Sequence, residues 1–318
     1  MFTNLTRSFH LSSSIHSTIL KHTSSVRLSS SLSKIHELAL SDPPDDPQND
    51  EWNLNIAHLL THHLNLPSNQ FTKILNKSYP PSPSLNATSF FEDLEKLKNN
   101  EPIQYILGTW DFHILENILC ESPVLIPRPE TEELVELLLK DIHEGKECKV
   151  LDIGTGTGCI GLSVLCSLPN IKMYGVEPAS AAYNLSSRNI AKFKNQFKPN
   201  SSYVKIYNCG ISELEDIMSF DYIITNPPYI PSSDMKGLKL NVLDYEDHAA
   251  LEGGQDGLKV INDIFEYVKK VRKLNGNVKV FGEGDVGHPE VLKGRVEGRV
   301  EGIKDFRGME RFFVVSYE

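Results

Sequence analysis

Short apolar runs alternate with longer amphipathic stretches along the second half of the chain. Strand-length runs rich in β-branched and aromatic residues lie at 150–153, 171–177, 203–207, 220–225, 278–281 and 311–316. Stretches with helical spacing of apolar residues lie between them, at 159–168, 180–193 and 257–274. Strands and helices that alternate at this spacing form βαβ units. The pattern predicts an α/β fold with a doubly wound, mainly parallel sheet, and the repetitive segment 294–302 is predicted to be a surface turn.

The first half of the chain shows a different pattern. Apolar residues recur at helical spacing from Glu51 to Asn76, which predicts two short helices separated at Leu66-Pro67, and a third helix is expected from Phe90 to Lys98. Residues 104–126 alternate β-formers with breaks and predict a hairpin that joins two domains. We therefore expect a helical bundle over 37–103, a β-hairpin linker over 104–126 and an α/β domain over 127–318.

The first 36 residues stand apart by composition. They contain no Asp or Glu, four basic residues and 11 Ser. A weakly basic, Ser-rich and acid-free segment is typical of organelle transit peptides, although a disordered N-terminus would have a similar composition. We expect residues 1–36 to be a transit peptide or disordered, and we leave them out of the fold.

Charge and cysteine content exclude several classes of protein. Without the first 36 residues, 28 basic residues face 42 acidic ones, a net charge of −14. Nucleic-acid binders rely on basic surfaces, so this balance counts against a duplex DNA substrate. The five cysteines never form a C-x-x-C pair, which argues against a disulfide framework or a zinc knuckle. No metal site and no membrane-spanning segment are expected.

A glycine-rich loop follows the first strand of the α/β region. Its sequence, Gly154-Thr155-Gly156-Thr157-Gly158, differs from the dinucleotide pattern G-x-G-x-x-G, and no Lys-Ser or Lys-Thr follows to make a phosphate-binding P-loop. Glu177 ends the next strand, where a carboxylate can accept hydrogen bonds from both ribose hydroxyls of a nucleoside. Together these features predict a nucleoside cofactor pocket. The alternative is a glycine turn with an unrelated surface acid.

A second motif, Asn226-Pro227-Pro228-Tyr229, follows the strand 220–225. Two consecutive prolines fix φ and remove two N–H donors, so this backbone offers only carbonyl acceptors. With the Asn226 carboxamide oxygen, they can accept from both N–H bonds of a planar NH₂ group, and the Tyr229 ring can pack against it. This clamp suits an amide or an exocyclic amine and does not suit a carboxylate or phosphate. The alternative is a simple Pro-Pro turn.

The two motifs together resemble the class I S-adenosylmethionine-dependent methyltransferases that act on planar nitrogen. Further segments resemble the protein-(glutamine-N5) methyltransferases of peptide chain release factors, in HemK/PrmC-like enzymes: 102–110, 126–136, 251–258 and 305–311. Related enzymes that modify a ribosomal protein typically have Pro-Arg-Ser-Pro where this chain has Pro-Arg-Pro-Glu. The resemblance therefore implies a release factor substrate, and the composition of the N-terminus favours the mitochondrial member of the family and the matrix as its location.

The resemblance also implies roles for individual residues. Residues 154–158 would hold the methionine and ribose portions of S-adenosyl-L-methionine, and Glu177 would bind the ribose diol. Residues 226–229 would be catalytic by clamping the substrate glutamine, and Asn226 would also contact the cofactor. Two segments depart from the family pattern: 208–211, where an acidic residue and an aromatic usually flank the adenine, and 245–248, where Glu-Pro is usual.

The implied reaction is methylation of the glutamine N5 in the Gly-Gly-Gln loop of a release factor, which supports translation termination. An amide nitrogen is a poor nucleophile, so the expected catalysis is positioning and electrostatic stabilisation, without a dedicated general base. We expect a monomer with no direct nucleic-acid substrate. The alternatives are a methyltransferase for DNA adenine N6 or cytosine N4, a ribosomal-protein glutamine methyltransferase, and a nicotinamide oxidoreductase or nucleoside-binding module.

Overall fold

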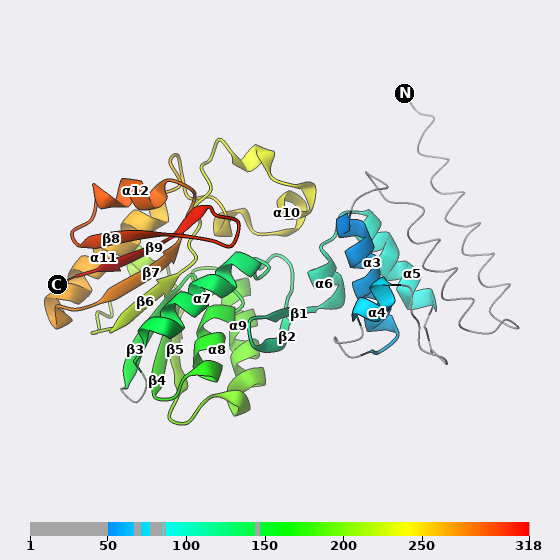
Figure 1. The fold of residues 1–318 in the computed structure, drawn as a ribbon, viewed down its shortest axis with the longest axis horizontal. Helices are drawn as coiled ribbons and strands as arrows, with labels where there is room; N and C mark the ends of the chain where they lie inside the picture. The colour runs from blue at the N-terminus through cyan, green and yellow to red at the C-terminus, as the bar shows by residue number, and fades with distance from the viewer. Residues whose placement is uncertain (1–49, 67–70, 77–84, 86, 144–146, 318) are drawn as a thin grey trace, which may run out of the picture. The chain divides into compact units, whose positions relative to one another are not determined.

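The computed structural model describes residues 50–66, 71–76, 85, 87–143 and 147–317. The chain divides into two compact units, Met1–Leu107 and Gly108–Glu318 (Figure 1). The segment predicted as a transit peptide, residues 1–36, lies outside the described residues, and so do the residues at the predicted break after Leu66.

The described part of the first unit is helical. It contains α3 (Asp50–His63), α4 (Phe71–Leu75), α5 (Ala87–Lys98) and α6 (Ile103–Leu107). The apolar residues that predicted these helices form its buried core, which includes Ile56, Leu59, Leu60, Ile74, Phe90 and Leu94. The three helices expected from periodicity are therefore confirmed. The fourth was not expected.

The segment 104–126 contains a hairpin that is shorter than predicted. Strands β1 (Thr109–Phe112) and β2 (Leu115–Leu119) pair antiparallel, and both belong to the second unit. The prediction was wrong for the start of the segment, which forms α6 instead of a strand. The Pro102 carbonyl accepts hydrogen bonds from the backbone N–H groups of Tyr105 and Ile106, which begins a helical turn despite the β-formers in its sequence.

The second unit is built around a seven-stranded sheet in the order β5-β4-β3-β6-β7-β9-β8. Five strands are parallel and β9 is antiparallel to both of its neighbours. The predicted doubly wound, mainly parallel sheet is confirmed. The strands are β3 (Cys148–Ile153), β4 (Ile171–Val176), β5 (Ser202–Tyr207), β6 (Tyr222–Thr225), β7 (Lys279–Glu283), β8 (Arg299–Lys304) and β9 (Glu310–Ser316).

Strand β8 corrects the prediction for residues 294–302. Only the first half of this repetitive segment is a turn, and its second half forms the edge of the sheet. The exposed charged residues Arg299, Glu301 and Lys304 alternate with partly buried ones. Edge strands commonly carry such charges, which oppose pairing with other molecules and also hide the apolar pattern of the strand.

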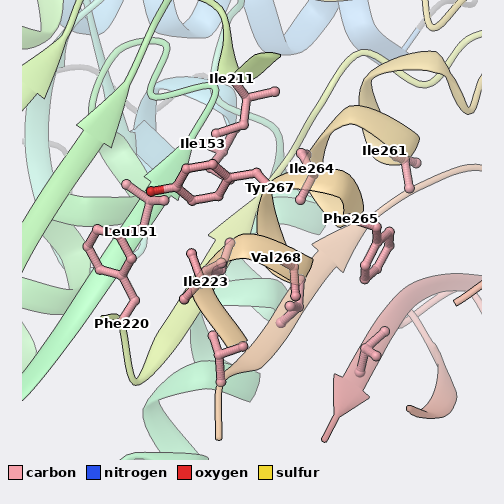
Figure 2. Packing of buried hydrophobic residues seen from close by; sticks show 14 of the residues in the cluster. Leu151, Ile153, Ile211, Phe220, Ile223, Ile261, Ile264, Phe265, Tyr267 and Val268 are labelled. Carbon is pink, nitrogen blue, oxygen red and sulfur yellow. The ribbon is translucent and has the colours of Figure 1, made fainter. Parts of the chain in front are cut away.

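Helices cover both faces of this sheet. Helices α7 (Pro129–Asp141), α8 (Cys159–Ser167) and α9 (Ser180–Phe193) lie together on one side, and α11 (Lys259–Asn275) and α12 (His288–Lys293) lie on the other (Figure 1). The short α10 (Leu240–Tyr245) follows β6. Figure 2 shows how Ile261, Ile264 and Val268 of α11 pack against the strands, where Leu151 and Ile223 project from the same face. This packing holds the carboxyl ends of the strands in place.

The register of the parallel strands brings distant residues together. Ile153 pairs with both Val176 and Thr225, and Thr225 pairs with Gly282. The residues that follow these positions therefore reach the same edge of the sheet: Gly154, Glu177, Asn226 and Glu283. The strand order also reverses at β3, and ligands of open α/β sheets bind in the crevice at such a reversal.

Candidate active site

A cavity lies at the carboxyl edge of the sheet, at this reversal. It is lined by the ends of β3 and β4, the starts of α9 and α11, and residues from four further segments: 123–125, 210–212, 226–228 and 247–250. Most of its wall is apolar, with Pro, Val, Ile and Ala side chains, and polar groups come from Glu177, Asn226, Asp247 and Asp263. A mostly apolar pocket with a few polar groups is typical of small-molecule sites.

The glycine loop passes directly beside the second motif. Gly154 has a φ of +76°, which glycine adopts without strain. A Cβ on Gly154 would lie 3.5 Å from the backbone oxygen of Asn226, so the two chain segments are nearly in contact. Gly154 and Gly156 line the cavity, whereas Thr155, Thr157 and Gly158 are buried behind the loop. Of the five predicted loop residues, the two glycines line the cavity, and the cofactor contacts predicted for all five stay predictions.

Glu177 ties the glycine loop to the start of α9. Its two carboxylate oxygens accept hydrogen bonds from the backbone N–H groups of Gly156 and Ala179, both at 2.8 Å. The residue lines the cavity, although only 6% of it is exposed, and this burial raises the pKa of its carboxyl group. Since a carboxylate has about four acceptor positions, two remain for a ligand. The predicted contact with a ribose diol is compatible with this geometry and stays a prediction.

Asn226 is held from behind by α7. Its Nδ2 donates to the hydroxyl of Thr131 at 2.9 Å, and that hydroxyl donates to Glu283 Oε2 at 2.8 Å. With its nitrogen committed to Thr131, the carboxamide has its oxygen as the acceptor for a ligand. Pro227 and Pro228 continue the cavity wall. Because the two prolines have no N–H, they offer only carbonyl acceptors in this wall.

Tyr229 is placed differently from the expectation. It is partly buried and is not among the residues that line the cavity. Its hydroxyl donates to Glu283 Oε1 at 3.0 Å, and burial together with the nearby Glu283 raises the pKa of the Tyr229 hydroxyl. The phenol therefore keeps its proton and anchors the motif to β7. Packing of its ring against a substrate stays a prediction.

The segment 251–258 supports residues 229–232 from the other side. Ile230 donates to the Leu251 carbonyl and accepts from the Gly253 N–H. A Cβ on Gly257, where φ is +73°, would lie 2.2 Å from the Tyr229 carbonyl oxygen. Only glycine lets the two backbones approach this closely. This explains physically why the chain carries a run of glycines here.

A partly buried ion pair lies next to two segments that line the cavity. Arg128 contacts both carboxylate oxygens of Glu246, at 2.6 and 2.7 Å, and the backbone N–H of Ile126 donates to the same carboxylate at 3.2 Å. The Asp247 N–H also donates to the Pro123 carbonyl. These bonds join the two cavity segments 123–125 and 247–250. Glu246 lies in the segment 245–248, which departs from the family pattern, and it is the acid that holds these two segments together.

The other departure, at 208–211, also reaches the cavity in part. Gly210 and Ile211 line it, whereas Asn208 donates to the carbonyl of Glu177 and holds two strand ends together. The segment thus supplies an aliphatic side chain, Ile211, and no aromatic ring or charge to the cavity.

The sequence motifs already singled out the segments 126–136 and 245–248, which contain Arg128, Thr131 and Glu246, but no role was predicted for these three side chains. Glu283 was missed, although an acid at the end of a predicted buried strand belongs to the same edge as Glu177. Among the described residues, no group of three or more His, Cys, Asp or Glu side chains could hold a metal ion. No helix in this part of the chain is long and apolar enough to cross a membrane.

Comparison with known proteins agrees with this architecture. The methyltransferase small domain family matches residues 128–286, which include all of the cavity lining except residues 123–125. The strand order, together with this family match, is that of the class I S-adenosylmethionine-dependent methyltransferase fold. A solved structure of the release factor-specific protein-(glutamine-N5) methyltransferase from Alicyclobacillus acidocaldarius is 26% identical, with a TM-score of 0.34, over 61% of this chain and 94% of that chain.

Two relatives cover more of the chain by sequence. The human MTRF1L release factor glutamine methyltransferase is 33% identical over 66% of this chain and 66% of its own length. This chain thus spans slightly less than two thirds of the human protein. The release factor glutamine methyltransferase of Streptococcus pneumoniae is 35% identical over 71% of this chain and 79% of its own length. At that identity and coverage, the chain belongs to the release factor glutamine methyltransferase family.

Proposed function

We propose that this protein transfers a methyl group from S-adenosyl-L-methionine to the side-chain nitrogen of the glutamine in the Gly-Gly-Gln loop of a peptide chain release factor. The observation that carries this proposal is the position of the Asn226 carboxamide. Its nitrogen is hydrogen-bonded to the Thr131 hydroxyl, and the residue lies at the edge of a mostly apolar cavity. Its oxygen and the carbonyls of the two prolines are acceptors, and a glutamine amide nitrogen supplies two donors.

The cavity residues fit the cofactor in its chemistry. Glu177 supplies a carboxylate for the ribose hydroxyls, Ile211 supplies an apolar contact for the adenine, and Gly154 and Gly156 leave room for the methionine portion beside Asn226. The bound cofactor supplies an electrophilic methyl group. The protein's contribution is to hold the amide nitrogen in line with it, at about 3 to 3.5 Å, and to stabilise the positive charge that develops on nitrogen.

Methylation of the release factor is tested directly with labelled cofactor. We expect the purified protein to label a recombinant mitochondrial release factor on its Gly-Gly-Gln loop, with a mass increase of one methyl group on the glutamine. The matched substrate carries Gly-Gly-Ala and should remain unlabelled. Labelling of both substrates, or of DNA in preference to the release factor, would contradict the assigned acceptor.

The helical first unit and the hairpin are proposed to recognise the body of the release factor, because they lie outside the segment 128–286 that matches the methyltransferase family. The proposed complex is one enzyme molecule with one release factor. Translation termination is the process that this modification would support.

We also propose that residues 1–36 direct the protein to the mitochondrial matrix, on the basis of their acid-free, Ser-rich composition. A fluorescent protein fused after residue 36 should accumulate in mitochondria. A matched fusion with Arg7, Lys21, Arg27 and Lys34 changed to Glu should stay outside, because import requires a positive segment. Equal distribution of both fusions would refute the assignment.

A further inference from the structure

Two residues without an assigned role, Thr131 and Glu283, lie directly behind the clamp. Glu283 ends β7, and the register places it beside Asn226 at the sheet edge. Thr131 lies in the first turn of α7 and its hydroxyl is between the two side chains. Both residues are buried, with exposed fractions of 1% for Glu283 and 3% for Thr131. Neither lines the cavity, so neither can contact a ligand there.

The hydrogen bonds among these groups have a fixed direction. A carboxylate oxygen can only accept, so the Thr131 hydroxyl gives its single hydrogen to Glu283. Toward Asn226 the same hydroxyl can then only accept, which requires the NH₂ end of the carboxamide to face it. The reversed carboxamide would place two acceptors against each other in a buried position, and such a contact is unfavourable.

The surroundings of Glu283 support its role as an acceptor. Thr131 and Tyr229 both donate to it, one to each carboxylate oxygen. Burial raises the pKa of Glu283, as does the nearby Glu130, and the two hydroxyl donors and the Arg311 guanidinium act in the opposite direction. Arg311 is itself held by Asp305, with 3.1 Å between its Nε and Oδ2. Two hydroxyl donors therefore contact the carboxylate, and the charge of Arg311 favours its ionised form.

We propose that Glu283 and Thr131 are positioning residues that set the direction of the Asn226 carboxamide, so that its oxygen faces the cavity and the site selects a nitrogen that donates hydrogen bonds. This inference rests on the proposed function and deepens it. We call the hydrogen-bonded series Glu283–Thr131–Asn226 the relay. The selectivity of the site for an amide over a carboxylate would come from this buried relay as well as from the Asn-Pro-Pro-Tyr motif.

The relay is tested with an isosteric pair of substitutions at Thr131. Thr131→Val keeps the shape and removes the hydroxyl, and Thr131→Ser keeps the hydroxyl. We expect Thr131→Val to lower kcat for release factor methylation by about 10- to 100-fold, with the Kd for S-adenosylmethionine within about threefold of wild type. Thr131→Ser should restore most of kcat. Glu283→Met, which removes the acceptor, should behave like Thr131→Val.

A second measurement distinguishes a reversed Asn226 carboxamide from a general loss of structure at the site. Release factors that carry Gly-Gly-Gln or Gly-Gly-Glu are bound to the enzyme loaded with the demethylated cofactor, S-adenosylhomocysteine, so that no transfer occurs, and the ratio of the two Kd values is compared. Wild type should prefer the glutamine loop strongly, and Thr131→Val should lose at least about tenfold of this preference because the NH₂ end of Asn226 can then face the cavity. Thr61→Val is the matched control, since Thr61 is also a buried threonine and its hydroxyl donates to the Ala57 carbonyl within α3.

Several outcomes would overturn the relay. These are full kcat in both Thr131→Val and Glu283→Met, an equal loss in Thr131→Ser, or a fall in kcat with an unchanged preference for the glutamine loop. Cofactor binding reports whether each variant is folded. If the wild-type protein itself transfers no methyl group to the release factor, the proposed function fails, and this result is distinct from a failure of the relay.

Discussion

Replacing Asn226 by alanine is expected to abolish methyl transfer while the cofactor still binds. The substitution removes the carboxamide oxygen that accepts from the substrate nitrogen and stabilises its developing charge, and a loss of one such group typically lowers kcat by about 10² to 10³-fold. The cofactor pocket keeps Glu177 and the glycine loop, so the Kd for S-adenosylmethionine should change by less than about fivefold. Isothermal titration and single-turnover methylation of the release factor measure the two quantities separately.

The control for this prediction is Asn262→Ala. Asn262 is an exposed asparagine on α11 that does not line the cavity, and its replacement should leave both quantities at the wild-type level. If Asn226→Ala weakened cofactor binding as strongly as it lowers kcat, Asn226 would be a cofactor ligand and not a substrate clamp. A variant that kept wild-type turnover would remove the chemical basis of the proposed function.

Replacing Glu177 by alanine is expected to have the opposite effect, which is weaker cofactor binding with little change in kcat. The ribose hydroxyls lose a charged acceptor, and hydrogen bonds to charged groups contribute about 1.5 to 3 kcal/mol each. The Kd for S-adenosylmethionine should therefore rise by about 10- to 100-fold, and kcat should largely recover at saturating cofactor. Glu177→Gln keeps one acceptor oxygen, so its Kd should lie between those of wild type and Glu177→Ala.

Part of this effect acts through the protein itself. Without the carboxylate, the N–H groups of Gly156 and Ala179 lose their acceptor, so the glycine loop and the start of α9 are less well held. A melting curve without cofactor measures this contribution. Glu301→Ala on the exposed edge strand β8 is the matched acidic control. An unchanged Kd in Glu177→Ala would show that the carboxylate only organises the loop.

The contrast between the two variants distinguishes the two halves of the site. Asn226→Ala should lose methyl transfer even at saturating cofactor. Glu177→Ala should lose it chiefly at cofactor concentrations below saturation. These two residues come from strands β6 and β4, on opposite sides of β3, and the glycine loop lies between them. If both predictions hold, the strand order of the sheet divides the cavity into a cofactor side at Glu177 and a substrate side at Asn226.

The sequence by itself determined the alternation of strands and helices in the second half, because buried parallel strands are short apolar runs and their covering helices are amphipathic. It also determined the acceptor-only chemistry of residues 226–228, since proline has no N–H wherever it lies in a fold. Residues 154, 156, 177 and 226 to 228 were predicted from local motifs, and the structure places all of them on one cavity.

Only the tertiary structure decided which residues stand behind that cavity. Thr131 and Glu283 are 152 residues apart, and Arg128 and Glu246 are 118 apart, and each contact exists because strand register and helix packing bring separate segments to one edge. No local pattern encodes such pairs. The helix α6 and the edge strand β8 were also decided by the tertiary structure, because their short sequences favour another conformation or none. The local sequence determines which functional groups a segment carries and which periodicity it has. The partners of buried polar groups are fixed only when the sheet assembles.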